Sequence, residues 1–320
     1  MASGGNDDVI ILWDLDARPI TSTHVLSGHS DSVDQILSDP NHKWLISGSR
    51  DSTIRFWDLE SSDPARDPLV YSGGISAMAL AAGCSKLVVG KSDGSVETLD
   101  LESSNPTENP RTLGGQLDDV TLVDISHDCK WFAAGGSDST IRLWGIDAED
   151  PSSEPFLLEG HTTSIGSIAF DSQNRWLASS SADDFAILWD FRGSDPGENP
   201  IMLNGHEKEI IRLDITPDGR WLITGSKDFT LRLWDLAAVD PSINALVLPG
   251  INNLKALESD NDWVVIGSQD KTARIWPLDL DRLYKMACEL TGRNLTQAEW
   301  EQYFSDQNYN PTCERWPVGQ

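Results

Sequence analysis

The sequence predicts an all-β fold, a seven-bladed β-propeller whose first blade is incomplete, followed by a short C-terminal helical tail. Three observations predict it. A short apolar run that ends in tryptophan or its replacement recurs seven times, at intervals of 42 to 45 residues. The intervals contain short strand-like runs separated by Gly, Asp, Asn and Pro turn signals. After Trp276 the apolar spacing changes from that of strands to that of a helix.

Each of the seven runs follows a turn rich in Gly and Ser that carries an aspartate, as in ISGSRDSTIRFWD and ITGSKDFTLRLWD. An interval of roughly 40–45 residues with four strands is the period of a propeller blade. The last positions of the runs are Trp13, Trp57, Leu99, Trp144, Trp189, Trp234 and Trp276.

Residues 205–248 show the elements of one period best. A Gly-His pair precedes a strand-like run that ends at Ile215, and a second run begins at Trp221. A turn with an aspartate leads into a third run, which ends at Trp234, and a short fourth run covers 245–248. Four short strands are therefore expected in each blade.

Two dipeptides recur at fixed places in the copies. Gly-His pairs occur at 28–29, 160–161 and 205–206, and Trp-Asp pairs at 13–14, 57–58, 189–190 and 234–235. In these residues and in its period, the chain from residue 2 to 276 resembles the WD40-repeat family. The resemblance implies a propeller that serves as a non-enzymatic protein-interaction scaffold or sensor.

A Ser or Thr, a His, an Asp and a Trp recur together in three copies. A nucleophilic triad needs one activated serine beside one oxyanion hole. This set repeats and accepts Thr in place of Ser, so we predict a structural role and no catalytic residue. The resemblance implies that each set forms a buried hydrogen-bond chain. The tetrads are His29, Ser47, Asp51 and Trp57; His161, Ser179, Asp183 and Trp189; and His206, Thr224, Asp228 and Trp234.

Other copies have lost members of the tetrad. Val89 and Leu99 stand where Ser and Trp are expected, and Ala134 and Ile266 replace Ser in two further copies. Loss of the polar chain is expected to soften these blades unless apolar packing replaces it, which Val89, Leu99, Ile251 and Ile266 indicate.

The resemblance also implies a contact surface on the narrower face of the propeller, where the turns between second and third strands lie. The residue before the turn aspartate is expected to point there, and two cations, Arg50 and Lys227, belong to this set. The predicted protein-binding face is Asn6, Arg50, Ser92, Ser137, Ala182, Lys227 and Gln269.

The chain is strongly acidic, with 51 acidic against 24 basic residues and a formal net charge of −27. Such a surface repels phosphate backbones, so nucleic acid is not an expected partner. No stretch approaches the ~20 apolar residues that span a bilayer, and we expect a cytoplasmic protein without membrane contact. No pair of histidines has the spacing of metal ligands, and neither a metal nor a cofactor is expected.

A second hypothesis is a propeller hydrolase or metal-dependent enzyme that uses carboxylates in the central channel. Asp124 and Asp214 occupy one first-strand position in two copies, and Glu258 is a possible third member. We expect solvated side chains at these positions. An enzyme would show one non-repeating polar cluster with shifted pKa values, whereas a docking module would show a broad open face.

Four cysteines are too few for a disulfide scaffold. Cys84 and Cys129 fall at matching turns of neighbouring blades, and we expect a separation beyond the ~7 Å Cα limit for a disulfide, hence free thiols. Cys288 and Cys313 are expected to lie close together in the tail, with their pairing left open.

The predicted domains are a propeller at 1–277 and a helical extension at 278–320 that packs on it. Met1 aligns with Leu45, inside a second strand, so the first blade is expected to lack its innermost strand and part of the next. The last blade is expected to lack its fourth strand. The chain is thus interpreted as a fragment, or an early start, of a longer polypeptide.

The tail sequence ACELTGRNLTQAEWEQYF, followed by YNPTC, is similar to tails that follow WD40 arrays in bacterial, particularly cyanobacterial, multidomain signalling proteins. This similarity implies that the propeller is the sensor or docking end of such a protein. Its partner is then either another domain of the parent polypeptide or a separate protein.

Overall fold

A computed structural model describes residues 1–81, 83–113, 119–145, 155–193, 195–249 and 254–279, together with 294 and 296. The chain divides into two compact units, Met1–Ile251 and Asn252–Gln320. The described elements are all strands, and they form seven antiparallel sheets. The all-β prediction is confirmed for this part of the chain.

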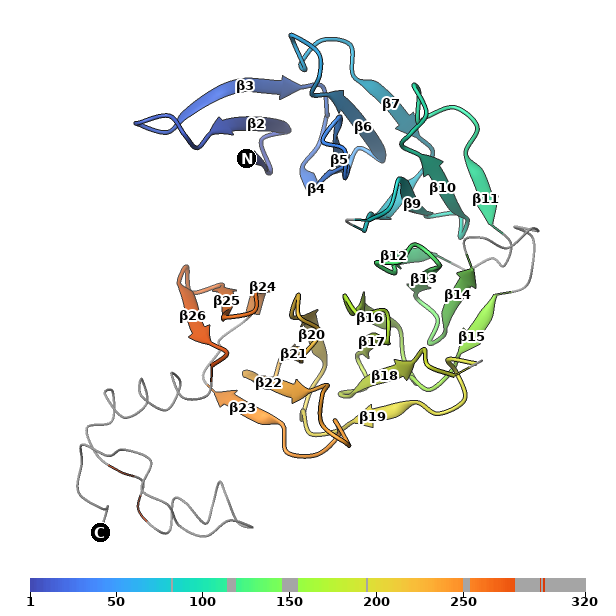
Figure 1. Cartoon of the computed structure of the whole chain (residues 1–320), viewed down its shortest axis with the longest axis vertical. Coiled ribbons are helices and arrows are strands. Elements are labelled where there is room, and N and C mark those ends of the chain that lie inside the picture. Colours follow the sequence, from blue (N-terminus) through green and yellow to red (C-terminus); the bar gives the residue numbers. More distant parts are fainter. Residues whose placement is uncertain are drawn as a thin grey trace. The chain divides into compact units, whose positions relative to one another are not determined.

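The first unit holds six sheets, which follow one another in chain order (Figure 1). The first sheet has three strands: β1 (Ala2–Gly4), β2 (Val9–Asp14) and β3 (Thr21–Ser27). The next two have four strands each: β4 (Val33–Ser38), β5 (Trp44–Ser49), β6 (Thr53–Asp58) and β7 (Leu69–Ser72); β8 (Ile75–Ala79), β9 (Lys86–Lys91), β10 (Val96–Asp100) and β11 (Arg111–Leu113).

Three more four-stranded sheets complete this unit. They are β12 (Val120–Ile125), β13 (Trp131–Gly136), β14 (Ile141–Gly145) and β15 (Phe156–Leu158); β16 (Ile165–Phe170), β17 (Trp176–Ser181), β18 (Ala186–Asp190) and β19 (Ile201–Leu203); and β20 (Ile210–Ile215), β21 (Trp221–Ser226), β22 (Thr230–Asp235) and β23 (Leu246–Pro249). The second unit holds a three-stranded sheet: β24 (Leu254–Ser259), β25 (Trp263–Ser268) and β26 (Ala273–Pro277).

Within the first unit, the first strand of each sheet from β8 onward contacts the second strand of the sheet before it, as β12 contacts β9 and β16 contacts β13, while β4 contacts β1 of the three-stranded sheet. Glycine allows this close approach. A Cβ atom on Gly90 in β9 would lie 2.4 Å from Cγ1 of Val120 in β12, which no packed core accommodates. Apolar side chains fill the space between the sheets, and Phe132 and Trp189 are fully buried there.

The seven expected copies therefore correspond to seven sheets. The first sheet has three strands, and so does the last among the described residues, as the sequence predicts. Apart from 278, 279, 294 and 296, the residues of the expected helical extension at 278–320, Cys288 and Cys313 among them, lie outside the described part of the chain. Closure of a seven-bladed ring and the boundary at 277/278 stay predictions.

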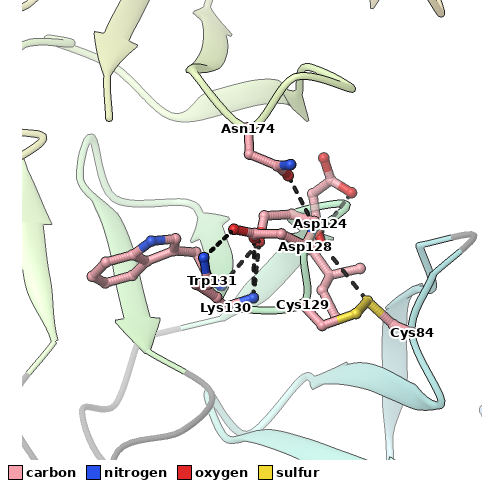
Figure 2. The surroundings of a disulfide bond; sticks show 9 residues. Cys84, Asp124, Asp128, Cys129, Lys130, Trp131 and Asn174 are labelled. Atoms are coloured by element: carbon pink, nitrogen blue, oxygen red, sulfur yellow. Dashed lines mark hydrogen bonds and ion pairs between the residues drawn. A yellow bond between two sulfur atoms is a disulfide. The ribbon is translucent and has the colours of Figure 1, made fainter. Parts of the chain in front are cut away.

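The expectation of free thiols at Cys84 and Cys129 is wrong. The two residues form a disulfide with a Cα separation of 5.6 Å (Figure 2). Cys84 lies in the turn between β8 and β9, and Cys129 lies in the turn between β12 and β13. The first strands of these sheets contact each other, so their adjoining turns lie much closer than a full blade width.

A glycine beside the disulfide lets the two turns meet. A Cβ atom on Gly83 would lie 3.0 Å from the carbonyl oxygen of His127 in the facing turn. On its other side, the Cys129 turn is joined to the β16–β17 turn, because the amide of Asp128 donates to Asn174 Oδ1 at 2.9 Å (Figure 2). Three successive sheets are thus connected at one end.

Candidate interaction face and buried tetrads

The three predicted tetrads form with nearly identical geometry. His29 Nδ1 lies 2.9 Å from Asp51 Oδ2, and His29 Nε2 lies 2.8 Å from Ser47 Oγ. The indole N–H of Trp57 donates to the same Ser47 Oγ at 2.9 Å. A carboxylate can only accept, so Nδ1 carries the imidazole proton and Nε2 accepts from the serine hydroxyl.

The other two tetrads repeat these contacts. His161 lies 3.0 Å from Asp183 Oδ2 and 2.8 Å from Ser179 Oγ. His206 lies 2.8 Å from Asp228 Oδ2 and 2.9 Å from Thr224 Oγ1. The indole N–H of Trp189 donates to the Ser179 hydroxyl at 3.0 Å, and that of Trp234 donates to the Thr224 hydroxyl at 3.0 Å.

The connectivity Asp–His–Ser is that of a nucleophilic triad, but access excludes that chemistry. The hydroxyl-bearing residues Ser47, Ser179 and Thr224 have no exposed surface. Each hydroxyl oxygen also accepts an indole N–H, so no substrate can approach it. The tetrads instead connect the loop before the first strand to the second and third strands of the same sheet.

Four ionisable groups of the tetrads, Asp51, Asp228, His161 and His206, have shifted pKa values. Burial alone would raise the pKa of Asp228, but hydrogen bonds from Thr230, His206 and the Glu207 amide outweigh it and lower the pKa to about 2. In the same way Asp51 has a pKa of about 2. Burial lowers the pKa of His206 and His161, so the neutral imidazole is favoured.

Sequence reasoning missed two repeat positions that extend the tetrad, one occupied by Thr and one by Arg. Thr53 Oγ1 donates to Asp51 Oδ1 at 2.6 Å, and Thr230 makes the same bond to Asp228 at 2.7 Å. Arg232 donates to the carbonyl of Gly205 at 2.6 Å. The signal was present in the repeat as Asp-x-Thr-x-Arg, which occurs at 51–55, 138–142, 228–232 and 270–274.

We expect His206→Ala to lower the free energy of unfolding by about 1–3 kcal/mol, because the Thr224 hydroxyl and Asp228 lose a buried partner. Chemical denaturation of the variant beside Lys208→Ala, a neighbouring change outside the tetrad, measures this. An unchanged stability of His206→Ala would contradict the structural role.

The pH dependence of Asp228→Asn supplies a further check. The folded-state pKa of Asp228 is about 2, below its ordinary value of 3.8. The carboxylate therefore contributes its full stabilisation above about pH 4, and this is lost as the pH falls through about 2. The stability difference between Asp228→Asn and the natural chain should accordingly shrink at acidic pH; a constant difference would contradict this sign.

The β8–β11 sheet, which lacks the tetrad, is held together differently. Val89 and Leu99 are buried, as expected for apolar replacement. Sequence reasoning missed an ion pair between Lys91 Nζ and Glu97 Oε2 at 2.6 Å, whose side chains are 12% and 10% exposed. The Tyr71 hydroxyl of β7 donates to the same carboxylate. This cluster joins β7 to β9 and β10, in place of a tetrad.

All residues of the predicted protein-binding face are exposed: Asn6, Arg50, Ser92, Ser137, Ala182, Lys227 and Gln269. Asn6 lies in the turn between β1 and β2, and each of the other six lies in the turn between the second and third strand of its sheet. Backbone hydrogen bonds to the loop before the first strand hold these turns in place. The amides of Arg50 and Lys227, for example, donate at 3.0 Å to the carbonyls of Ser32 and Glu209.

The two cations of this set are paired. Arg50 Nε donates to Asp34 Oδ2 at 2.8 Å, which raises the pKa of the guanidinium, and Lys227 Nζ contacts Glu209 Oε2. The side chains of Arg50 and Lys227 are 66% and 55% exposed, so solvent screens both pairs. Each position therefore presents a cation and an anion together.

The expectation that Asp124 is solvated is wrong. Its Oδ2 accepts the Phe170 amide of the next sheet at 2.7 Å, and its Oδ1 accepts the Ile125 amide at 2.9 Å. Burial raises the pKa of Asp124 to about 6. The carboxyl group thus connects β12 to β16. Glu258, by contrast, is exposed.

Within the described residues, no group of three or more His, Cys, Asp or Glu side chains could hold a metal ion. No helix in that part of the chain has the length and apolar character needed to cross a membrane.

A family model described as "WD domain, G-beta repeat" matches residues 20–58, 108–145, 153–190, 197–235 and 248–277, together more than half of the chain. The first four matches begin at or just before the last strand of one sheet and run through the third strand of the next. Residues 59–107, which carry the Lys91–Glu97 pair, lie outside the matches.

Several curated proteins are similar to parts of the chain. "Cell division control protein 4" of Saccharomyces cerevisiae is 32% identical over 28% of this chain and 10% of its own length. "Striatin-4" of Homo sapiens is 40% identical over 20% of this chain and 10% of its own length. "Protein transport protein sec13" of Emericella nidulans is 30% identical over 20% of this chain and 22% of its own length. The chain thus spans a small part of these relatives.

Proposed function

The chain belongs to the WD40-repeat family, and from this premise we propose that it is a non-enzymatic protein-interaction scaffold or sensor module. Domains of this family are usually non-catalytic and typically bind proteins. One observation carries the proposal: the repeated Ser/Thr, His and Asp groups are buried in structural chains, whereas the turn residues at one end of the sheets are exposed.

The proposed contact surface is the predicted face formed by those turns. Turn backbones fixed by hydrogen bonds to the preceding loops offer a preorganised surface, which lowers the entropic cost of binding. We propose that the six exposed positions of the first unit belong to one contact face. The place of Gln269, in the second unit, on that face stays a prediction.

The charge of the chain favours a protein partner with basic patches. A net charge of −27 attracts such patches and repels nucleic acid and anionic membranes. The paired cations Arg50 and Lys227 supply local positive charge on the proposed face, so an acidic side chain of the partner can be accommodated there.

We also propose that the chain is part of a larger bacterial signalling protein and that residues 278–320 pack on the propeller. It is supported by the tail sequence alone, which lies beyond the residues that the family model matches. Sequencing of the coding region on both sides of the chain tests it directly.

The cytoplasmic location also stays a prediction. The Cys84–Cys129 disulfide weighs against it, because disulfides persist mainly in oxidising compartments. Mass spectrometry of the protein after alkylation in intact cells distinguishes a reducing from an oxidising compartment. Alkylated Cys84 and Cys129 would support a reducing compartment, and a disulfide-linked peptide would support an oxidising one.

We expect the double charge reversal Arg50→Glu and Lys227→Glu to weaken binding of the partner about 3- to 30-fold without changing the fold. The reason is the loss of two cations from the proposed face. The partner is first isolated by affinity capture on the natural chain and then titrated against both proteins at several salt concentrations, since an electrostatic contact weakens as salt rises.

A matched control uses Arg66→Glu with Arg192→Glu. These residues lie in the connectors between third and fourth strands, at the opposite end of their sheets, and the net charge changes equally. Loss of binding in this control, with none in the Arg50 and Lys227 variant, would move the contact surface to the other end of the sheets.

A further inference from the structure

Phe229 occupies a turn position whose backbone conformation disfavours its side chain. It follows the tetrad residue Asp228 in the turn between β21 and β22, and its φ is 70°. Among the residues that the structure describes, it is the only aromatic Phe, Tyr or Trp and the only branched aliphatic residue with a positive φ. Bulky side chains adopt this conformation only at a free-energy cost. The phenyl ring therefore needs a role that offsets the cost.

Folding of the turn does not require an apolar residue at this position. Ser52, Asp184 and Lys271 hold the same place after the turn aspartate in other sheets, with φ values of 64°, 72° and 65°. All three are polar, and the first two are also short. The side chain of Phe229, by contrast, leaves the residue 46% exposed. An exposed aromatic ring at a strained position is thus better explained by a contact outside the chain than by the fold.

A lysine stands over this ring. The ammonium nitrogen of Lys208, which lies in the loop before β20, is 5.8 Å from the ring centroid of Phe229. Such an approach of a cation to an aromatic face is attractive. Lys227, two residues before Phe229, is paired with Glu209, but Lys208 forms no ion pair with any carboxylate in the described part of the chain. The positive charge beside the ring is therefore available to a ligand.

Hydrogen bonds hold the loop and the turn in a fixed relation. Ser226 Oγ donates to the carbonyl of Lys208 at 2.7 Å, and the amide of Phe229 donates to the carbonyl of Ser226 at 3.2 Å. The amide of Glu207 donates to Asp228 Oδ2 at 3.1 Å, which ties the loop to the tetrad. The backbones that carry the ring and the ammonium group are thus positioned before binding, which lowers the entropic cost of a contact.

We propose that Phe229 and Lys208 anchor a partner protein through a segment that carries an aromatic or aliphatic side chain next to a carboxylate. The apolar side chain packs against the exposed phenyl ring, and the carboxylate pairs with the Lys208 ammonium group. A few aromatic and cationic residues commonly supply most of the binding free energy of an interface. This inference rests on the contact surface proposed above. The remaining surface of the partner carries the basic patches that the net charge of the chain favours.

The probe is a phage-displayed library of random twelve-residue peptides, selected on the immobilised full chain. We expect the enriched peptides to share an aromatic or aliphatic residue next to Asp or Glu. A synthetic, fluorescently labelled copy of an enriched peptide should bind the Phe229→Asn variant about tenfold more weakly than the natural chain, because the apolar anchor is lost. Lys208→Gln should weaken binding several-fold and reduce its dependence on salt, since one ion pair is removed.

Val239→Asn is the matched control, because Val239 is fully exposed in the connector after β22, at the other end of the same sheet, and should not affect binding. Phe229→Asn should not lower the melting temperature, since Asn adopts a positive φ more readily than Phe. A fall of several degrees would assign the ring to the fold and overturn the proposal.

The proposal is also overturned if the selection enriches no peptide, if the enriched peptides lack the shared pattern, or if they bind the Phe229→Asn variant as tightly as the natural chain. Peptides that depend on Arg50 and Lys227 but not on Phe229 would leave the contact surface standing and remove its anchor. The two proposals therefore fail by different results.

Discussion

Breaking the Cys84–Cys129 disulfide is expected to lower the free energy of unfolding by about 2–4 kcal/mol. The bond links two sheets across a separation of 45 residues, so the unfolded chain regains a large loop when it is cut. For a unit of this size the loss corresponds to a fall in melting temperature of about 4–8 °C. Thermal unfolding of the Cys84→Ala, Cys129→Ala double variant measures it.

Reductant provides the control. The natural chain with dithiothreitol should approach the melting temperature of the double variant, and the double variant itself should not respond to dithiothreitol. A residual response would be assigned to Cys288 and Cys313. Equal melting temperatures of the natural chain and the variant under oxidising conditions would show that the bond contributes nothing. The hydrogen bond from Asp128 to Asn174 still joins the Cys129 turn to the next sheet.

The repeat period predicts the sheets and the tetrads well because both are local to one copy. Hydrophobic alternation and turn residues define each strand, and the fixed offsets of His, Ser and Asp bring them together through a shared register. The partner of Ser47 in β4, for example, follows from the same pairing in every complete sheet.

Contacts between neighbouring sheets are not encoded in that period. Asp124 and Phe170 lie in different copies, as do Cys84 and Cys129, and their approach depends on how closely the first strands converge. Alignment of the copies treats each position as equivalent in every blade. It therefore missed these bonds, and it interpreted Asp124 as solvated and Cys84 as a free thiol.

Removing one partner of the Lys91–Glu97 pair is expected to cost about 2–4 kcal/mol, somewhat less than the ~3–5 kcal/mol of a fully buried pair. Both side chains are nearly buried, so Lys91→Met leaves a carboxylate and Glu97→Gln leaves an ammonium group without its counter-charge. Burial and Glu97 together raise the pKa of Tyr71, so its hydroxyl stays protonated and continues to donate. Urea unfolding of each variant gives the two losses.

The double variant Lys91→Met with Glu97→Gln distinguishes the pair from its parts. Since no uncompensated charge is left, its loss should be smaller than the sum of the single losses, and the difference is the coupling free energy of the pair. Strict additivity, or single losses below about 0.5 kcal/mol, would place the pair among exposed salt bridges. A large coupling free energy between Lys91 and Glu97 would instead mean that a buried ion pair connects the strands of this sheet, where other sheets have a tetrad.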